Sequence, residues 1–270
     1  MNAIILSIRS EFFKNRKTAG FRSAVFLPLF LCTLLFISFY SHNDDMVHTP
    51  SVILWIQFAG TIFSAMGTLL LPMLIVFVSY SVNNIEHKSD TWKSLFSLPI
   101  PKFPIYLGKY SYALFIILWC LALFVIFTVA AGNLLSLVKP QLNFHDYSIT
   151  GILLKMYFKL FLSSLGILSI QFILSLLFRD FLKPMGIGFV ATMAGIILAS
   201  NHWTYAYLFP YAHPMITISA MPQTHSRGVS GKIIPAINIE ILTREIIISI
   251  IISVAVFVAG YFIVLKKSVK

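Results

Sequence analysis

Long apolar runs alternate with shorter polar segments along this chain, and the runs determine its architecture. Six runs reach the length of roughly 20 mostly apolar residues that a helix needs to cross the hydrocarbon core of a bilayer. They are apolar on every side rather than striped, which does not fit a water-soluble bundle. The pattern predicts an all-α polytopic membrane protein with a single transmembrane domain over residues 1–270. The predicted spans cover about residues 22–40, 55–82, 110–133, 156–178, 184–200 and 245–265.

The composition and charge agree with this class of protein. Hydrophobic residues make up 58% of the chain and charged residues 11%, whereas soluble domains carry about 25% charged residues. The net charge of +11 comes from basic residues that flank the apolar runs, so membrane orientation explains it and no nucleic-acid partner is expected. Cys32 and Cys120 both lie inside apolar runs, where free thiols are expected rather than a disulfide framework.

The distribution of Lys and Arg predicts the orientation of the spans. If both termini are cytoplasmic, 14 of the 20 Lys and Arg residues lie on the cytoplasmic side, as the positive-inside rule requires. The first loop on the other side contains Asp44 and Asp45 and no basic residue. We therefore expect both termini in the cytoplasm.

Residues 1–20 precede the first span and combine apolar with basic side chains. Over residues 3–16 the two kinds can occupy opposite faces of a helix, which predicts an interfacial helix that contacts the lipid bilayer. A frayed basic tail is the alternative. A signal peptide is disfavoured, because the basic region is long and no A-x-A-like cleavage site follows Tyr40.

The connection between the second and third predicted spans is longer than a turn requires, since about two to eight residues suffice. It carries Trp92, Leu95 and Phe96 among polar and basic residues. We interpret residues 84–98 as an amphipathic helix that docks onto a cytoplasmic partner. The alternative is a solvated basic loop that only follows the positive-inside rule.

The longest predicted connection, residues 201–244, begins with an aromatic stretch that two prolines interrupt. It is too apolar for water and too broken to span, which predicts short helices that re-enter or lie at the outer leaflet. Its aromatic residues either anchor the fold or contact a substrate, and two intramembrane glutamines either bond neighbouring helices or bind substrate. The candidate substrate or gate residues are Trp203, Tyr207, Phe209, Tyr211, Gln57 and Gln171.

No motif for nucleotide, metal or hydrolytic chemistry is evident. The Gly-rich string at 228–233 lacks the spacing and the Ser or Thr of a Walker loop. His202 and His213 have no Cys or carboxylate neighbours, so we expect no metal site and no catalytic residue. Lys155 and Lys159 lie one turn apart and are expected to snorkel outward. Acidic residues avoid mid-span positions, where an ion-coupled carrier would need them, so the energy for any transport must come from elsewhere.

The polar connection and its flanks resemble the permease subunits of ABC-2 type transporters. The pattern in that family is an acidic residue, a Thr, an apolar doublet, a Leu-Pro-Ile string, a basic residue and a Lys that leads into span three. The matching positions here are Glu86, Thr91, Leu95, Phe96, Leu98-Pro99-Ile100, Lys102 and Lys109. Asp90 departs from the Gly that is common in the family, and Lys102 from the Arg that is frequent there; the first change puts the local turn geometry in question.

The resemblance implies an exporter-like fold with six spans and a cytoplasmic coupling helix at 84–98. It also implies that the chain is no enzyme and holds no cofactor of its own, because ATP and Mg bind to a separate ABC ATPase. Two ATPase copies would act with a pair of permeases, the second being an identical copy or a paralogue. The residues implied in ATPase coupling are Glu86, Thr91, Trp92, Lys93, Leu95, Phe96, Leu98 and Pro99.

Thr91-Trp92-Lys93 and the stretch from Trp203 to Pro214 are most similar to the lantibiotic-immunity and bacitracin-resistance group of these permeases. This similarity implies a bacterial cell membrane and the expulsion of an antimicrobial peptide or another amphiphilic molecule. Two other classes stay open. One is a membrane anchor or scaffold that recruits a cytoplasmic partner without transport, and the other is an intramembrane enzyme with polar residues around one cavity.

Overall fold

Helices are the regular elements of the described part of the chain, which contains no strand. Six of its helices are long and apolar enough to cross a membrane, which confirms the prediction of an all-α protein with six candidate spans. The computed structural model describes residues 3–41, 49–88, 101–142, 144, 147–219 and 239–266. The six candidate spans are Ala19–Ser41, Ser51–Lys88, Lys102–Val138, Thr150–Leu177, Leu182–Ser200 and Arg244–Lys266.

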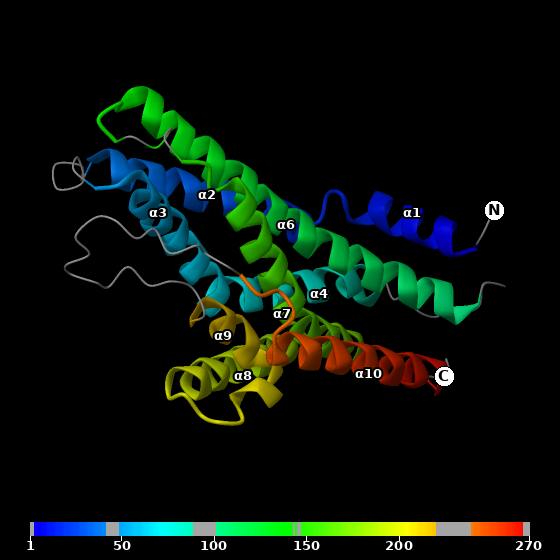
Figure 1. The fold of residues 1–270 in the computed structure, drawn as a ribbon. Coiled ribbons are helices and arrows are strands. Elements are labelled where there is room, and N and C mark those ends of the chain that lie inside the picture. The colour runs from blue at the N-terminus through cyan, green and yellow to red at the C-terminus, as the bar shows by residue number, and fades with distance from the viewer. Residues whose placement is uncertain are drawn as a thin grey trace.

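The helices follow one another with short connections in the described ranges (Figure 1). Each predicted span lies within the corresponding candidate span of the structure, with one exception. The fourth predicted span, 156–178, extends one residue beyond the end of its helix at Leu177. The first half contains α1 (Ala3–Asn15), α2 (Ala19–Ser41), α3 (Ser51–Ala65), η1 (Met66–Leu70), α4 (Leu71–Lys88) and α6 (Lys102–Val138). The second half contains α7 (Thr150–Leu177), α8 (Leu182–Ser200), η3 (Ala206–Leu208), η4 (Pro210–Ala212), α9 (His213–Ser219) and α10 (Arg244–Lys266).

The second span is one continuous element in which α3 passes through the π-helical stretch η1 into α4. The amide of Leu71 bonds to the carbonyl of Met66, and Pro72 has no amide of its own to continue the α-helical pattern. The wide turn presents Gly67 to the side chain of Ile218 on α9. A 38-residue element is about 57 Å long at 1.5 Å per residue, so it extends beyond a hydrocarbon core of about 30 Å.

Helix α7 occupies the centre of the bundle and packs against α4, α6 and α10 (Figure 1). Its candidate span is the most buried of the six, whereas α2, α8 and α10 are mainly exposed and apolar. A hydroxyl network ties α7 to its neighbours. Tyr110 Oη lies 2.6 Å from Ser169 Oγ, and Ser169 Oγ lies 2.8 Å from Ser253 Oγ, so polar groups that would be costly in lipid find partners inside the bundle.

The described part of the connection that follows α8 forms η3, η4 and α9, which fold back onto α7 and α8. Gly195 allows this approach, because a side chain there would collide with the backbone of Tyr211. Gly188 allows α8 to approach α7, because a side chain there would collide with Gln171. Gly186 instead faces open space.

Candidate functional site

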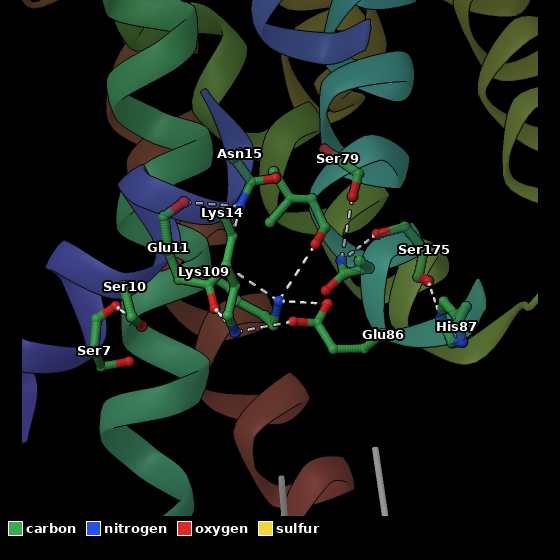
Figure 2. Close-up of polar contacts among 12 residues, drawn as sticks. Ser7, Ser10, Glu11, Lys14, Asn15, Ser79, Glu86, His87, Lys109 and Ser175 are labelled. Carbon is green, nitrogen blue, oxygen red and sulfur yellow. Dashed lines mark hydrogen bonds and ion pairs between the residues drawn. The ribbon is translucent and has the colours of Figure 1, made fainter. Parts of the chain in front are cut away.

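Four charged side chains from three helices meet where α1, α4 and α6 pack together (Figure 2). Lys109 Nζ lies 2.7 Å from Glu86 Oε2 and 3.2 Å from Glu11 Oε2. Lys14 Nζ lies 3.3 Å from Glu11 Oε1 and 3.4 Å from Glu86 Oε1. Each carboxylate therefore bridges both ammonium groups through different oxygens, and the four residues form a closed ring of alternating charge. We call these four residues the ion cluster.

The ion cluster is deeply buried on one side and reaches the surface on the other. Glu11, Glu86 and Lys109 are at most 2% exposed, whereas the side chain of Lys14 is 36% exposed. Burying a single charge is costly unless an opposite charge compensates it, and the neutral ring provides this compensation. Burial alone would lower the pKa of Lys14, but the carboxylates of Glu11 and Glu86 outweigh that effect and raise it.

Polar neighbours hold the ion cluster in place. Asn15 lies one turn after Glu11 on α1, and its Nδ2 donates a hydrogen bond to Glu11 Oε2 at 3.1 Å. On α4, the amide of Asn83 donates to Ser175 Oγ at 2.7 Å, and His87 Nε2 lies 3.0 Å from the Ser175 carbonyl oxygen. Because Asn83 and His87 flank Glu86 within one helical turn, the last turn of α4 is attached to α7 and to α6 at once.

The ion cluster brackets the connection that the sequence predicts to be the coupling helix. Glu86 lies two residues before the end of α4 at Lys88, and Lys109 lies in the second turn of α6. An ion pair therefore joins the two helices that enter and leave the connection. Displacing the connection would act on α4 and α6 together, and through Glu11 on α1.

Only one of the predicted coupling residues belongs to the described part of the chain. Glu86 is directed into the protein toward Lys109 and Lys14. The other predicted coupling residues, Thr91, Trp92, Lys93, Leu95, Phe96, Leu98 and Pro99, lie outside the described residues.

Sequence reasoning did not identify Glu11, Lys14 and Lys109 as partners of Glu86. One signal was available, because Glu11 is the only acidic residue before Asp44. A single carboxylate in a basic, apolar helix indicates a specific partner. The identity of that partner depends on which helix packs against α1, and this follows from the fold alone.

The predicted substrate or gate residues occupy different environments. Gln171 and Tyr211 come together in the core, where Gln171 Nε2 donates to Tyr211 Oη at 2.7 Å, so Gln171 joins α7 to η4. Phe209 packs beside Tyr211, and Tyr207 stacks under the guanidinium of Arg244. The two remaining candidates lie elsewhere: Trp203 is exposed after α8, and Gln57 is partly buried on α3.

A second buried ion pair lies between α7 and α10. Lys159 Nζ is 3.7 Å from Glu245 Oε1, and both residues are buried. The expectation that Lys159 snorkels outward is therefore wrong, because α10 brings a carboxylate to it; Lys155 is exposed. The nearby His213 is buried, with Nε2 2.8 Å from the Tyr207 carbonyl oxygen. In the described residues no group of three or more His, Cys, Asp or Glu could hold a metal ion.

Comparison with known families gives one match. The model of a family described as ABC-2 family transporter protein matches residues 7–195, which run from α1 through the ion cluster into α8. No curated protein and no solved structure matches the chain.

Proposed function

The chain belongs to the ABC-2 family of transporters, and on that premise we propose that it is the permease subunit of an ATP-driven exporter. The family match carries this proposal, because it covers most of the spans together with the connection between the second and third. The chain has no phosphate-binding loop. ATP and Mg therefore bind to a separate ATPase, and this subunit converts the motion of that ATPase into movement of its spans.

The ion cluster supports coupling through residues 84–98. A docking segment transmits force only if the helices at both of its ends move with it. Glu86 and Lys109 join these two helices at 2.7 Å, and Glu11 adds α1. In the proposed assembly, two ATPase copies bind a pair of permeases, either identical or paralogous, with the docking segments and both termini in the cytoplasm of a bacterial cell.

We propose that the substrate is an amphiphile, such as a lantibiotic-like antimicrobial peptide. Trp203, Tyr205 and Leu208 are 48%, 53% and 53% exposed at the end of α8. Contiguous exposed aromatic and apolar side chains are typical of surfaces that bind other apolar molecules. An amphiphile that leaves the bilayer would find such a surface where the span ends.

Capture of the ATPase tests the permease assignment. The tagged chain, purified from its own host in mild detergent, should retain a stoichiometric ABC ATPase that mass spectrometry identifies. Replacing Leu95 and Phe96 by Asp should abolish the capture and leave membrane insertion intact. The matched control is Leu242→Asp, since Leu242 is an exposed apolar residue in the connection before α10. Unchanged capture by the double variant would disprove the docking role of 84–98.

The substrate requires a separate measurement. In proteoliposomes that contain the permease and its ATPase, a lantibiotic should raise ATP hydrolysis, and the peptide should leave the membrane only when ATP is present. A complex that forms but neither responds to peptides nor releases them would retain the family assignment and remove the proposed substrate. It would instead favour a membrane anchor that recruits the ATPase without transport.

A further inference from the structure

A shallow hollow of about 520 Å³ lies along one face of α1. At 100° per residue, Arg9 and Phe13 occupy the side of α1 opposite to Glu11, and Arg16 follows directly after the last residue of the helix. The hollow is therefore separate from the ion cluster, although both belong to the same helix. It is lined by Leu6, Arg9, Ser10, Phe12, Phe13 and Arg16.

The rim of this hollow carries positive charge that the described part of the protein does not compensate. Arg9 lies on α1 and Arg16 follows directly after its last residue, Asn15, and both are exposed. Within the described ranges neither forms an ion pair. Arg16 Cζ lies 4.2 Å from the centre of the Phe13 ring, and Phe13 is 66% exposed. Two unpaired guanidinium groups thus flank an apolar floor.

An aromatic track leads from this floor onto a membrane span. The ring centres of Phe12 and Phe115, which is on α6, lie 4.8 Å apart. Phe115 in turn stacks on Trp119, with 6.1 Å between the ring centres. Phe115 and Trp119 are 40% and 42% exposed. The track therefore continues from the basic rim along the outside of α6, in the direction that the acyl chain of a lipid would take.

We propose that the hollow binds an anionic phospholipid, with its phosphate between Arg9 and Arg16. Guanidinium groups bind phosphate through paired, charge-assisted hydrogen bonds. The acyl chain lies on Phe12, Phe115 and Trp119. A free phosphate could bind the two guanidinium groups but would leave these three rings uncovered. The position of α1, directly before the span α2 at Ala19, places the rim at the depth of the headgroups. This site does not depend on the proposed transport function.

Lipid binding to the purified full-length chain tests the proposal. Native mass spectrometry would count bound phosphatidylglycerol and phosphatidylcholine at equal added concentrations. We expect wild type to prefer phosphatidylglycerol, and the double variant Arg9→Gln/Arg16→Gln to bind it about thirtyfold more weakly, as two basic residues near an anionic surface imply. The control Lys17→Gln/Arg22→Gln removes the same charge from exposed positions and should bind nearly as well as wild type, because neither residue lines the hollow.

Three results would overturn the proposal. They are equal binding of both lipids by wild type, an equal loss in the control variant, and displacement of the lipid by millimolar inorganic phosphate, which would indicate a plain anion site. A second measurement detects the site in a bilayer even if a variant is unstable in detergent. Brominated phosphatidylglycerol in phosphatidylcholine nanodiscs should quench the tryptophan fluorescence of wild type. Brominated phosphatidylcholine in phosphatidylglycerol nanodiscs, at the same mole fraction, should quench it less. Trp119→Phe should remove this difference, and its persistence would contradict the proposed tail position.

Discussion

The ammonium of Lys109 lies 2.7 Å from the carboxylate of Glu86, although α4 ends and α6 begins between these two positions. The contact joins the helices on either side of the connection from 89 to 101. Both side chains are almost fully buried, where charges are poorly screened by salt. The pair therefore fixes the spacing between the end of α4 and the start of α6, so a displacement of either helix end would be passed on to the other.

Replacing Lys109 by Met should strongly destabilise the protein. The carboxylates of Glu11 and Glu86 would remain buried with Lys14 as their shared cation, and breaking a buried ion pair costs about 3–5 kcal/mol. We expect a fall of about 10 °C in the melting temperature in detergent, measured by the change in intrinsic fluorescence.

The exposed pair of Lys183 and Asp180, whose charged groups lie 3.7 Å apart, provides the control for this prediction. Lys183→Met should leave the melting temperature nearly unchanged, because surface ion pairs contribute little. Adding Glu86→Gln to Lys109→Met should restore part of the loss, since one uncompensated carboxylate disappears. Equal melting temperatures for Lys109→Met and Lys183→Met would contradict a structural role for the ion cluster.

Gly195→Ala should loosen the packing of α8 against η4. The new Cβ would collide with the carbonyl of Tyr211 and lie 2.8 Å from the amide nitrogen of Ala212, and backbone atoms cannot rotate away. Overpacking of this kind costs about 1–3 kcal/mol. Gly186→Ala on the same helix meets no atom within 4 Å, so its melting temperature should equal or slightly exceed that of wild type. Equal losses in both variants would contradict the packing of Gly195 against Tyr211 as the cause.

Lys159→Met should destabilise the contact between α7 and α10, and Lys155→Met should not. Without Lys159, the buried carboxylate of Glu245 retains the hydroxyl of Thr243 as a donor but loses its cation. We expect a loss of about 2 kcal/mol in the free energy of unfolding, measured by denaturant titration in detergent. A comparable loss for Lys155→Met, one turn away and exposed, would mean that positive charge on α7 matters rather than the pair.

Acidification should weaken the fold through His213. Burial lowers the pKa of this residue below its usual value, against the opposing effects of the Tyr207 carbonyl and Glu245. The unfolded chain therefore takes up the proton first, so stability falls as the pH drops below about 6.5 and continues to fall until the folded-state pKa is reached. The melting temperature of wild type should decrease from pH 7 to pH 5.

His213→Gln should flatten this pH profile, because a glutamine amide can still donate to the Tyr207 carbonyl but does not titrate. The exposed His202 offers a matched control in the same connection, and His202→Gln should keep the slope of wild type. If both variants retain that slope, another group is responsible for the acid sensitivity.

The spans were predictable because the requirement that defines them is local. A helix in a bilayer must be apolar over about 20 residues whatever surrounds it, and the runs near 22–40 and 245–265 show this directly. The same reasoning anticipated an amphipathic helix over residues 3–16, where the structure has α1. The sequence also selected Gln171 and Tyr211 as candidate substrate or gate residues, but it did not show that they bond to each other.

The functional site was predictable only in part. Glu86 was selected as a coupling residue from its place in a family pattern, but its buried partners were not. Lys109 and Lys159 were counted as basic residues at span ends, and the structure shows each of them buried against a carboxylate. The count of charges near a span predicts an orientation, but it does not distinguish a lysine in water from one in an ion pair.

By itself, the sequence determined that this protein crosses the membrane with six apolar helices and that its charges concentrate at their ends. Only the tertiary structure decided that Glu11, 98 positions before Lys109, contacts it, and that Gly195 rather than Gly186 touches another element. Insertion of a helix depends on the apolarity of its own residues. The pairing of charges and the closeness of packing depend on which helices become neighbours, and that information is distributed over the whole chain.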